Sequence, residues 1–179
     1  KQTLSVVGLS LPEAFSVLAP DADYDVRREL SERYKSAFRD LDRDPGECEF
    51  LFPGAKEMIE TLAREDGVVL GIATGKSRRG VDRLFAREGW EKHFTTIQTA
   101  DDHPSKPHPS MLTRAMAETG ATRQQTIMIG DTTYDIEMAR AAELEKGKFS
   151  SDQWLFQRSP QPDATATALL KTPGGLVRL

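Results

Sequence analysis

The stretch Thr126–Asp135 (TIMIGDTTYD) constrains the fold more than any other part of the chain. A short apolar run ends at Gly130 and is followed by Asp131 and by a helical pattern that continues to about Ala142. A strand that stops at a glycine and leads directly into a helix predicts a strand–helix unit. Asp131 is then expected at the carboxyl end of a buried strand. Asp135 is expected to face the same way, because residues i and i+4 share one face of a helix.

Two carboxylates at one sheet edge indicate a cation. They repel one another and cost stability unless a positive charge lies between them. Oxygen ligands of this kind suit Mg²⁺, which commonly takes one or two carboxylates together with substrate phosphate and water. Asp131 and Asp135 are therefore candidate Mg²⁺ ligands. The alternative is an aspartate that caps a helix and is followed by a solvated helix face, and the spacing alone leaves both interpretations open.

The region from Gly67 onward alternates strands with helices. Strands are predicted at 68–73, 94–98 and 126–130, and helices at 77–88, 109–119 and 132–142. This order predicts an α/β fold, a Rossmann-like three-layer α/β/α core with a parallel sheet. Ligands of such sheets bind beyond the carboxyl ends of the strands, where Thr74, Asp131 and the loop that carries Lys106 are expected.

The first 64 residues are predicted to be mostly helical. Helices are expected from Leu11, over 24–41 and over 55–64. Tyr24, Tyr34 and Phe38 are at helical spacing, which predicts that they pack within this segment. Beyond Ala142, a weak helix is predicted over Ala166–Lys171.

Composition excludes several classes of protein. The chain has 179 residues and a net charge of -4 with no basic block, which argues against a nucleic-acid partner. A single cysteine, Cys48, excludes an intramolecular disulfide framework and fits a reducing compartment. No apolar run approaches the roughly 18 residues that a membrane helix needs, so no membrane partner is expected and a cytoplasmic location is the default.

Three ordered motifs together resemble a known family. They are Thr74-Gly75-Lys76-Ser77 after an apolar strand, Ser105-Lys106-Pro107-His108-Pro109, and Gly130-Asp131-Thr-Thr-Tyr-Asp135. They resemble motifs II, III and IV of the haloacid dehalogenase (HAD) superfamily, and are most similar to phosphoglycolate-phosphatase-like members with a helical cap. The resemblance covers roughly Val7 to Ala142, and three motifs in order are far more specific than one.

The resemblance implies a function and a role for each residue. It implies a Mg²⁺-dependent phosphatase that acts on a small phosphorylated metabolite through an aspartyl-phosphate. Thr74 and Gly75 would hold the phosphate, and Lys106 would offset the charges of phosphate and nucleophile. Asp131 would bind Mg²⁺ directly, and Asp135 would bind it or orient its waters. For Lys106 alone, the alternative is a solvated loop lysine, although three neighbouring prolines stiffen that loop.

The family's nucleophile is not visible in the sequence. It is the first Asp of a D-x-D-G-T motif, and no such motif is present. The D-x-D pattern around Asp21 and Asp23 follows Ala-Pro rather than an apolar strand. We therefore expect the chain to begin inside the cap, after the nucleophile. The predicted organisation is a helical cap segment and return to the core over 1–64, a HAD-like core over 65–142 and a divergent tail over 143–179.

Alternative functions follow from the same residues. A chain without its nucleophile could be a truncated, non-catalytic relative that binds phosphate, Mg²⁺ or a partner. A sugar-phosphate phosphomutase is a neighbouring variant of the enzyme, and a homodimer is possible. His103 and His108 flank Lys106 and are candidates to assist at the site, but two histidines make a poor zinc site.

Overall fold

The computed structural model describes residues 3–41, 51, 54–130, 132–144 and 168–171. The elements in chain order are η1 (Thr3–Val6), α1 (Leu11–Leu18), α2 (Tyr24–Leu41), α3 (Ala55–Leu62), β1 (Val69–Thr74), α4 (Arg78–Glu88), β2 (Phe94–Thr99), α5 (Ser110–Thr119), η2 (Arg123–Gln125), β3 (Thr126–Ile129), α6 (Thr133–Ala141) and β4 (Ala168–Lys171). The predicted strands and helices between residues 67 and 142 are all present, with ends that differ by at most one residue.

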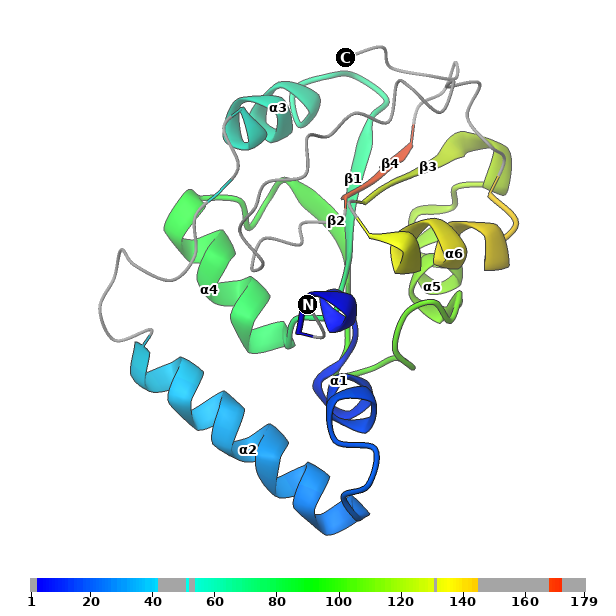
Figure 1. Ribbon diagram of the computed structural model, residues 1–179. Helices are drawn as coiled ribbons and strands as arrows, with labels where there is room; N and C mark the ends of the chain where they lie inside the picture. Colours follow the sequence, from blue (N-terminus) through cyan, green and yellow to red (C-terminus); the bar gives the residue numbers. More distant parts are fainter. Residues whose placement is uncertain (1–2, 42–50, 52–53, 131, 145–167, 172–179) are drawn as a thin grey trace.

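The sheet has the strand order β2-β1-β4-β3 (Figure 1). β1 pairs with β2 in parallel, and β4 pairs antiparallel with both β1 and β3. β1, β2 and β3 therefore run in the same direction, which confirms the predicted parallel core. β4 makes the complete sheet a mixed one.

The prediction of a weak helix over Ala166–Lys171 is wrong, because Ala168–Lys171 forms β4. Leu170 pairs with Leu70 on one side and with Ile127 on the other. A strand in this position supplies ladder hydrogen bonds to both neighbours, which a helix there could not do, and tertiary context of this kind overrides a weak local propensity.

Helices cover both faces of the sheet, which confirms the three-layer α/β/α arrangement. Alternate residues of β1 face opposite layers, as the pleat of a strand requires. Leu70 and Ile72 pack with Ile59 and Leu62 of α3 and with residues of α4. Ala73 faces the other way and packs in a second cluster that is formed by β3, α5 and α6. Figure 1 shows α3 and α4 on one side of the sheet and α5 and α6 on the other.

Helices α1 and α2 form a hairpin that extends away from the sheet (Figure 1). Phe15 contacts Tyr34 edge to face, with ring centroids 6.3 Å apart. Tyr24 is 73% exposed, so the prediction that it packs within this segment is wrong. Asp23 caps α2, since its carboxylate accepts a hydrogen bond from the Val26 amide at 2.9 Å. Helix capping therefore explains the presence of this carboxylate in the D-x-D pattern without any catalytic role.

None of the helices that the structure describes is long and apolar enough to cross a membrane. Cys48 and the side chain of Phe38 lie outside the described residues. The division into cap segment, core and tail stays a prediction.

We expect Leu112→Ala to lower the free energy of unfolding by about 2–5 kcal/mol, because Leu112 is fully buried between α5 and the sheet and its loss leaves a cavity. Urea unfolding measures the change. Val17→Ala is the control: Val17 is 53% exposed, and a change within about 0.5 kcal/mol is expected. Equal effects in the two variants would contradict the described packing.

Candidate active site at the carboxyl ends of the strands

The predicted site residues that the structure describes lie at one edge of the sheet. Ile72 and Ile129 both pair with Ala168, so they lie at the same level of the sheet. Thr74 is the last residue of β1, and Gly130 directly follows the last residue of β3, so both lie at the carboxyl ends of their strands. The loop that follows β2 leads to Lys106. Parallel strands deliver their carboxyl ends to the same edge, which is where α/β folds bind ligands.

Lys106 and Asp135 form a buried ion pair. The ammonium Nζ of Lys106 donates a hydrogen bond to Oδ1 of Asp135 at 2.6 Å, and their side chains are 0% and 1% exposed. Charged groups are rarely buried unless they are paired, since isolated burial of an ion costs several kcal/mol. The alternative of a solvated loop lysine is therefore wrong. The structure joins two predicted site residues that are 29 positions apart in the chain.

Thr132 holds the second oxygen of Asp135. Its amide and hydroxyl both donate to Asp135 Oδ2, at 3.2 and 2.7 Å. These contacts form a capping box at the start of α6, in which the Asp135 amide in turn approaches the Thr132 hydroxyl at 3.3 Å. The carboxylate is thus oriented on both sides. We did not predict this role of Thr132, although a threonine three residues before an acidic residue at a helix start is the signal for it.

Gly130 makes room for the Asp135 carboxylate. A Cβ atom added at Gly130 would lie 2.3 Å from Cβ of Asp135 and 2.7 Å from its Oδ2. Such contacts exclude any side chain at this position, so the glycine between the strand and the acidic helix start is a steric requirement.

The phosphate-binding candidates Thr74 and Gly75 lie at the end of β1, where the N-terminal segment of residues 5–10 packs against Gly75. Thr74 is buried, and its hydroxyl oxygen accepts a hydrogen bond from the Lys76 amide at 3.2 Å. A Cβ added at Gly75 would lie 3.1 Å from the carbonyl oxygens of both Gly8 and Leu9. The backbones of two distant segments therefore meet closely at Gly75.

The same N-terminal segment also contacts the other two motifs. The Ser10 amide donates to Oγ of Ser105 at 2.8 Å, beside Lys106. The Tyr134 hydroxyl donates to the Ser5 carbonyl at 2.9 Å, beside Asp135. Residues 5–10 therefore contact all three motifs.

Asp131 lies outside the described residues. Among the residues that the structure does describe, no group of three or more His, Cys, Asp or Glu side chains could hold a metal ion. The metal-binding roles of Asp131 and Asp135 and the phosphate-binding roles of Thr74, Gly75 and Lys106 stay predictions.

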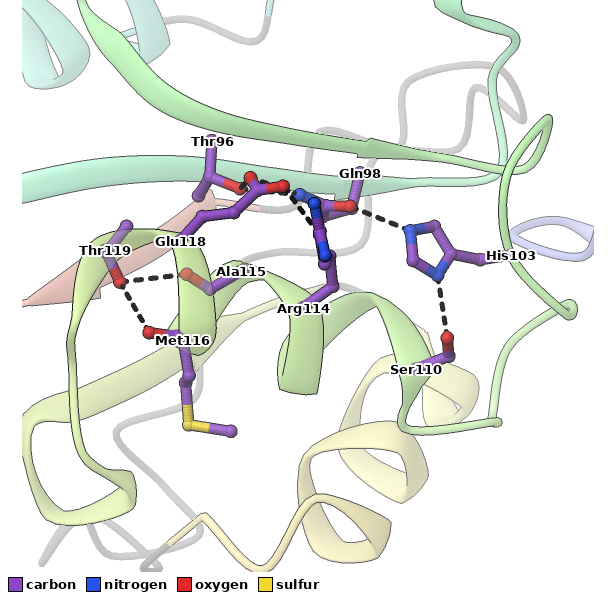
Figure 2. A network of polar contacts seen from close by, with 9 residues as sticks. All are labelled: Thr96, Gln98, His103, Ser110, Arg114, Ala115, Met116, Glu118 and Thr119. Carbon is purple, nitrogen blue, oxygen red and sulfur yellow. Dashed lines mark hydrogen bonds and ion pairs between the residues drawn. The ribbon is translucent and has the colours of Figure 1, made fainter.

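A polar network connects β2 with α5 beside the site (Figure 2). Gln98 donates to Thr96 Oγ1 at 2.7 Å and to Glu118 Oε2 at 2.8 Å, and its carbonyl faces His103. Glu118 also accepts hydrogen bonds from the Thr96 hydroxyl and from Arg114, both at 2.7 Å. The Thr96 hydrogen bond, aided by Arg114 and Gln98 and opposed by desolvation, lowers the pKa of the Glu118 carboxyl below its usual value near 4.5.

Comparison with known proteins agrees with the three motifs. Residues 1–146 match the family described as haloacid dehalogenase-like hydrolase. The chain belongs to this family. The resemblance predicted from the motifs is therefore confirmed.

Several curated HAD-like relatives are named as phosphatases. The chain is 34% identical over 143 residues to "Probable phosphatase IndB" of Dickeya dadantii, which covers 77% of the chain and 60% of that relative. It is 30% identical over 122 residues to a phosphoglycolate phosphatase of Pseudomonas putida, and the match covers 68% of this chain and 44% of that relative. It is 35% identical over 95 residues to pyrophosphatase PpaX of Oceanobacillus iheyensis, and the match covers 52% of this chain and 44% of that relative. The chain thus spans about half the length of these relatives.

Solved structures share the fold. A chain from Bacteroides fragilis, described as haloacid dehalogenase-like, superposes with a TM-score of 0.70 at 24% identity over 86% of this chain and 74% of its own. A hydrolase from Pseudomonas syringae superposes with a TM-score of 0.64 at 21% identity, covering 86% and 72%. Similarity at this level of identity supports the α/β core alone.

The ion pair yields a stability prediction. Lys106→Met and Asp135→Asn should each lower the free energy of unfolding by about 3–5 kcal/mol, because each removes one charge from an ion pair whose two side chains are buried. The double variant should lose less than the sum of the two, and urea unfolding of all three variants gives the coupling energy. Strictly additive losses would show that the pair contributes no coupling.

Glu118 yields a pH prediction. Its pKa is lower in the folded state than in the unfolded chain, so its contribution to stability is full above pH 4.5 and is lost as the pH falls through the folded-state value. Glu118→Gln should therefore be less stable than the parent near pH 7, and the difference should shrink below pH 4.5. Thermal unfolding across this range measures it, and a difference that stays constant with pH would contradict the assigned interactions.

Proposed function

We propose that these residues form the phosphate- and Mg²⁺-binding part of a phosphatase that hydrolyses a small phosphate monoester. The observation that carries the proposal is the buried Lys106–Asp135 pair, which holds a cation at the sheet edge shared with Thr74, Gly75 and the start of α6. The chain's membership of the HAD-like hydrolases and the names of its relatives support the same reaction class.

Phosphoryl transfer depends mainly on position and charge. Charge develops on the oxygens of the transferring group, and fixed donors and cations stabilise it. The Lys106 ammonium is held in place by Asp135, so it is oriented before substrate arrives. In the proposed site, the hydroxyl of Thr74 and the amide of Gly75 would donate to phosphate oxygens at the end of β1. These groups bind and orient the phosphate without forming a covalent bond to it.

The donor set fits Mg²⁺. Asp135 presents carboxylate oxygens in a fixed orientation at the same edge, and Asp131 is the second residue after β3 in the sequence. Hard oxygen ligands of this type suit Mg²⁺ and not a soft metal. When bound, Mg²⁺ neutralises phosphate charge and polarises the bond to be broken. Asp135 would then interact both with the Lys106 ammonium and with the metal ion or its bound waters.

The attacking carboxylate is proposed to lie outside these 179 residues. No D-x-D-G-T motif is present in the printed sequence, and Asp23 serves as a helix cap. The intact mass of the protein from its natural source tests this part of the proposal. A mass well above 19.9 kDa would agree with a further segment, and a mass of 19.9 kDa would favour a binding protein without turnover.

The substrate is proposed to be 2-phosphoglycolate or a similarly small phosphate ester. Two of the relatives discussed above are named for phosphoglycolate and for pyrophosphate, which are both compact and highly charged. A comparison of kcat/KM for 2-phosphoglycolate, pyrophosphate and a sugar phosphate separates these cases. Transfer of the phosphate to a second sugar hydroxyl rather than to water would identify a phosphomutase instead.

We expect Asp131→Asn in the natural polypeptide to lower Mg²⁺-dependent phosphate release by at least about 10²-fold while the protein stays folded, because the change removes a ligand and a charge but little volume. Released phosphate and circular dichroism measure the two effects. Asp21→Asn is the matched control, and it should retain normal activity. Near-normal activity of Asp131→Asn would overturn the metal assignment.

A further inference from the structure

We propose that His103 is a positioning residue that holds the Lys106 loop in its active geometry. The proposal rests on the function above insofar as it concerns catalysis. The loop of residues 100–109 joins β2 to α5 and carries Lys106. The ring of His103 is half-buried and lies between these two elements (Figure 2). Its Nε2 lies 2.7 Å from Gln98 Oε1 on β2, and its Nδ1 lies 2.7 Å from Ser110 Oγ on α5.

The network assigns the proton on the ring. Gln98 uses its amide nitrogen to donate to Thr96 and Glu118, so its oxygen is the group that faces His103. An amide oxygen only accepts, and therefore Nε2 of His103 carries the hydrogen and donates. In the neutral ring Nδ1 then accepts from the Ser110 hydroxyl. Every hydrogen bond in this chain of contacts has one donor and one acceptor.

The groups that hold His103 are themselves fixed. Thr96 and Gln98 are 2% and 5% exposed within β2. Glu118 on α5 accepts from both of them and from Arg114. His103 therefore attaches the loop to a strand and a helix that the network also connects to one another. A loop residue fastened to two rigid elements loses much of its freedom to move.

The requirement for such an anchor comes from Lys106. Its ammonium must reach Asp135 at 2.6 Å with no exposure to water, from a loop in which five neighbouring residues are exposed: Asp101, Asp102, Pro104, Pro107 and His108. Two residues before Lys106 hold the loop in place. Ser105 accepts a hydrogen bond from the Ser10 amide, and His103 contacts Ser110 on α5. Displacement of a charged group by about 1 Å can cost 10²-fold in rate, so this anchor acts on catalysis through Lys106.

The test follows the exposure of Lys106 and does not require activity. Lysines are acetylated with acetic anhydride, and the rate at each peptide is measured by mass spectrometry, with the exposed Lys56 as the internal reference. His103→Ala should raise the rate at Lys106 relative to Lys56 by about tenfold, because two hydrogen bonds that hold the loop are lost. His93→Ala, a change at another partly buried histidine, should leave the ratio unchanged.

Two conservative variants separate the halves of the anchor. Asparagine places its oxygen near the position of Nδ1, so His103→Asn keeps the contact with Ser110. Glutamine places its amide near Nε2, so His103→Gln keeps the contact with Gln98. Each should give a labelling ratio between those of the parent and His103→Ala, and each preserves a polar contact that favours folding. An equal rise at every lysine in all three variants would indicate a purely structural role and overturn the proposal.

Turnover of the natural polypeptide supplies the second measurement. His103→Ala should lower kcat for a small phosphate ester by about tenfold with a smaller change in KM, because the misplaced ammonium loses most in the transition state. Unchanged kcat together with an unchanged labelling ratio would overturn the role of His103 and leave the phosphatase intact. An inactive parent whose Lys106 nevertheless becomes labelled in His103→Ala would overturn the phosphatase and support the anchor.

Discussion

The buried pair of Lys106 and Asp135 is the interaction on which the rest of the site depends. Neither charge could be buried alone at an acceptable cost in free energy, so each requires the other within hydrogen-bond distance. That requirement places the β2–α5 loop against the start of α6. It also explains two neighbours of Asp135, because Gly130 leaves space for its carboxylate and Thr132 orients the remaining oxygen.

Close backbone contact completes the site from the other side. The N-terminal segment packs against Gly75 through the carbonyl oxygens of Gly8 and Leu9, and it contacts the other two motifs through Ser10 and Ser5. These contacts place residues 5–10 beside all three motifs at the carboxyl ends of the strands. If the proposed phosphatase function holds, residues of this segment lie close enough to the proposed phosphate-binding groups to affect substrate choice.

Sequence reasoning was most successful where a repeating pattern carried the signal. The alternation of apolar strands and amphipathic helices predicted the parallel core, and the three motifs predicted the family. It failed where local pattern was weak or where partners were distant. Leu170 pairs with two strands about 100 and 43 positions away, which no local propensity can indicate. The exposure of Tyr24 depends on what packs beside α2, and helical spacing does not contain that information.

The sequence by itself determined the fold class, the family and the residue types at the sheet edge, because periodicity and motif order are properties of the linear chain. The tertiary structure decided which of those residues act on one another. Lys106 pairs with the buried Asp135, and the Thr132 hydroxyl donates a hydrogen bond to the same carboxylate. His103 connects β2 with α5. These contacts depend on distances of about 3 Å between segments that are far apart in the chain, and only the packed fold sets such distances.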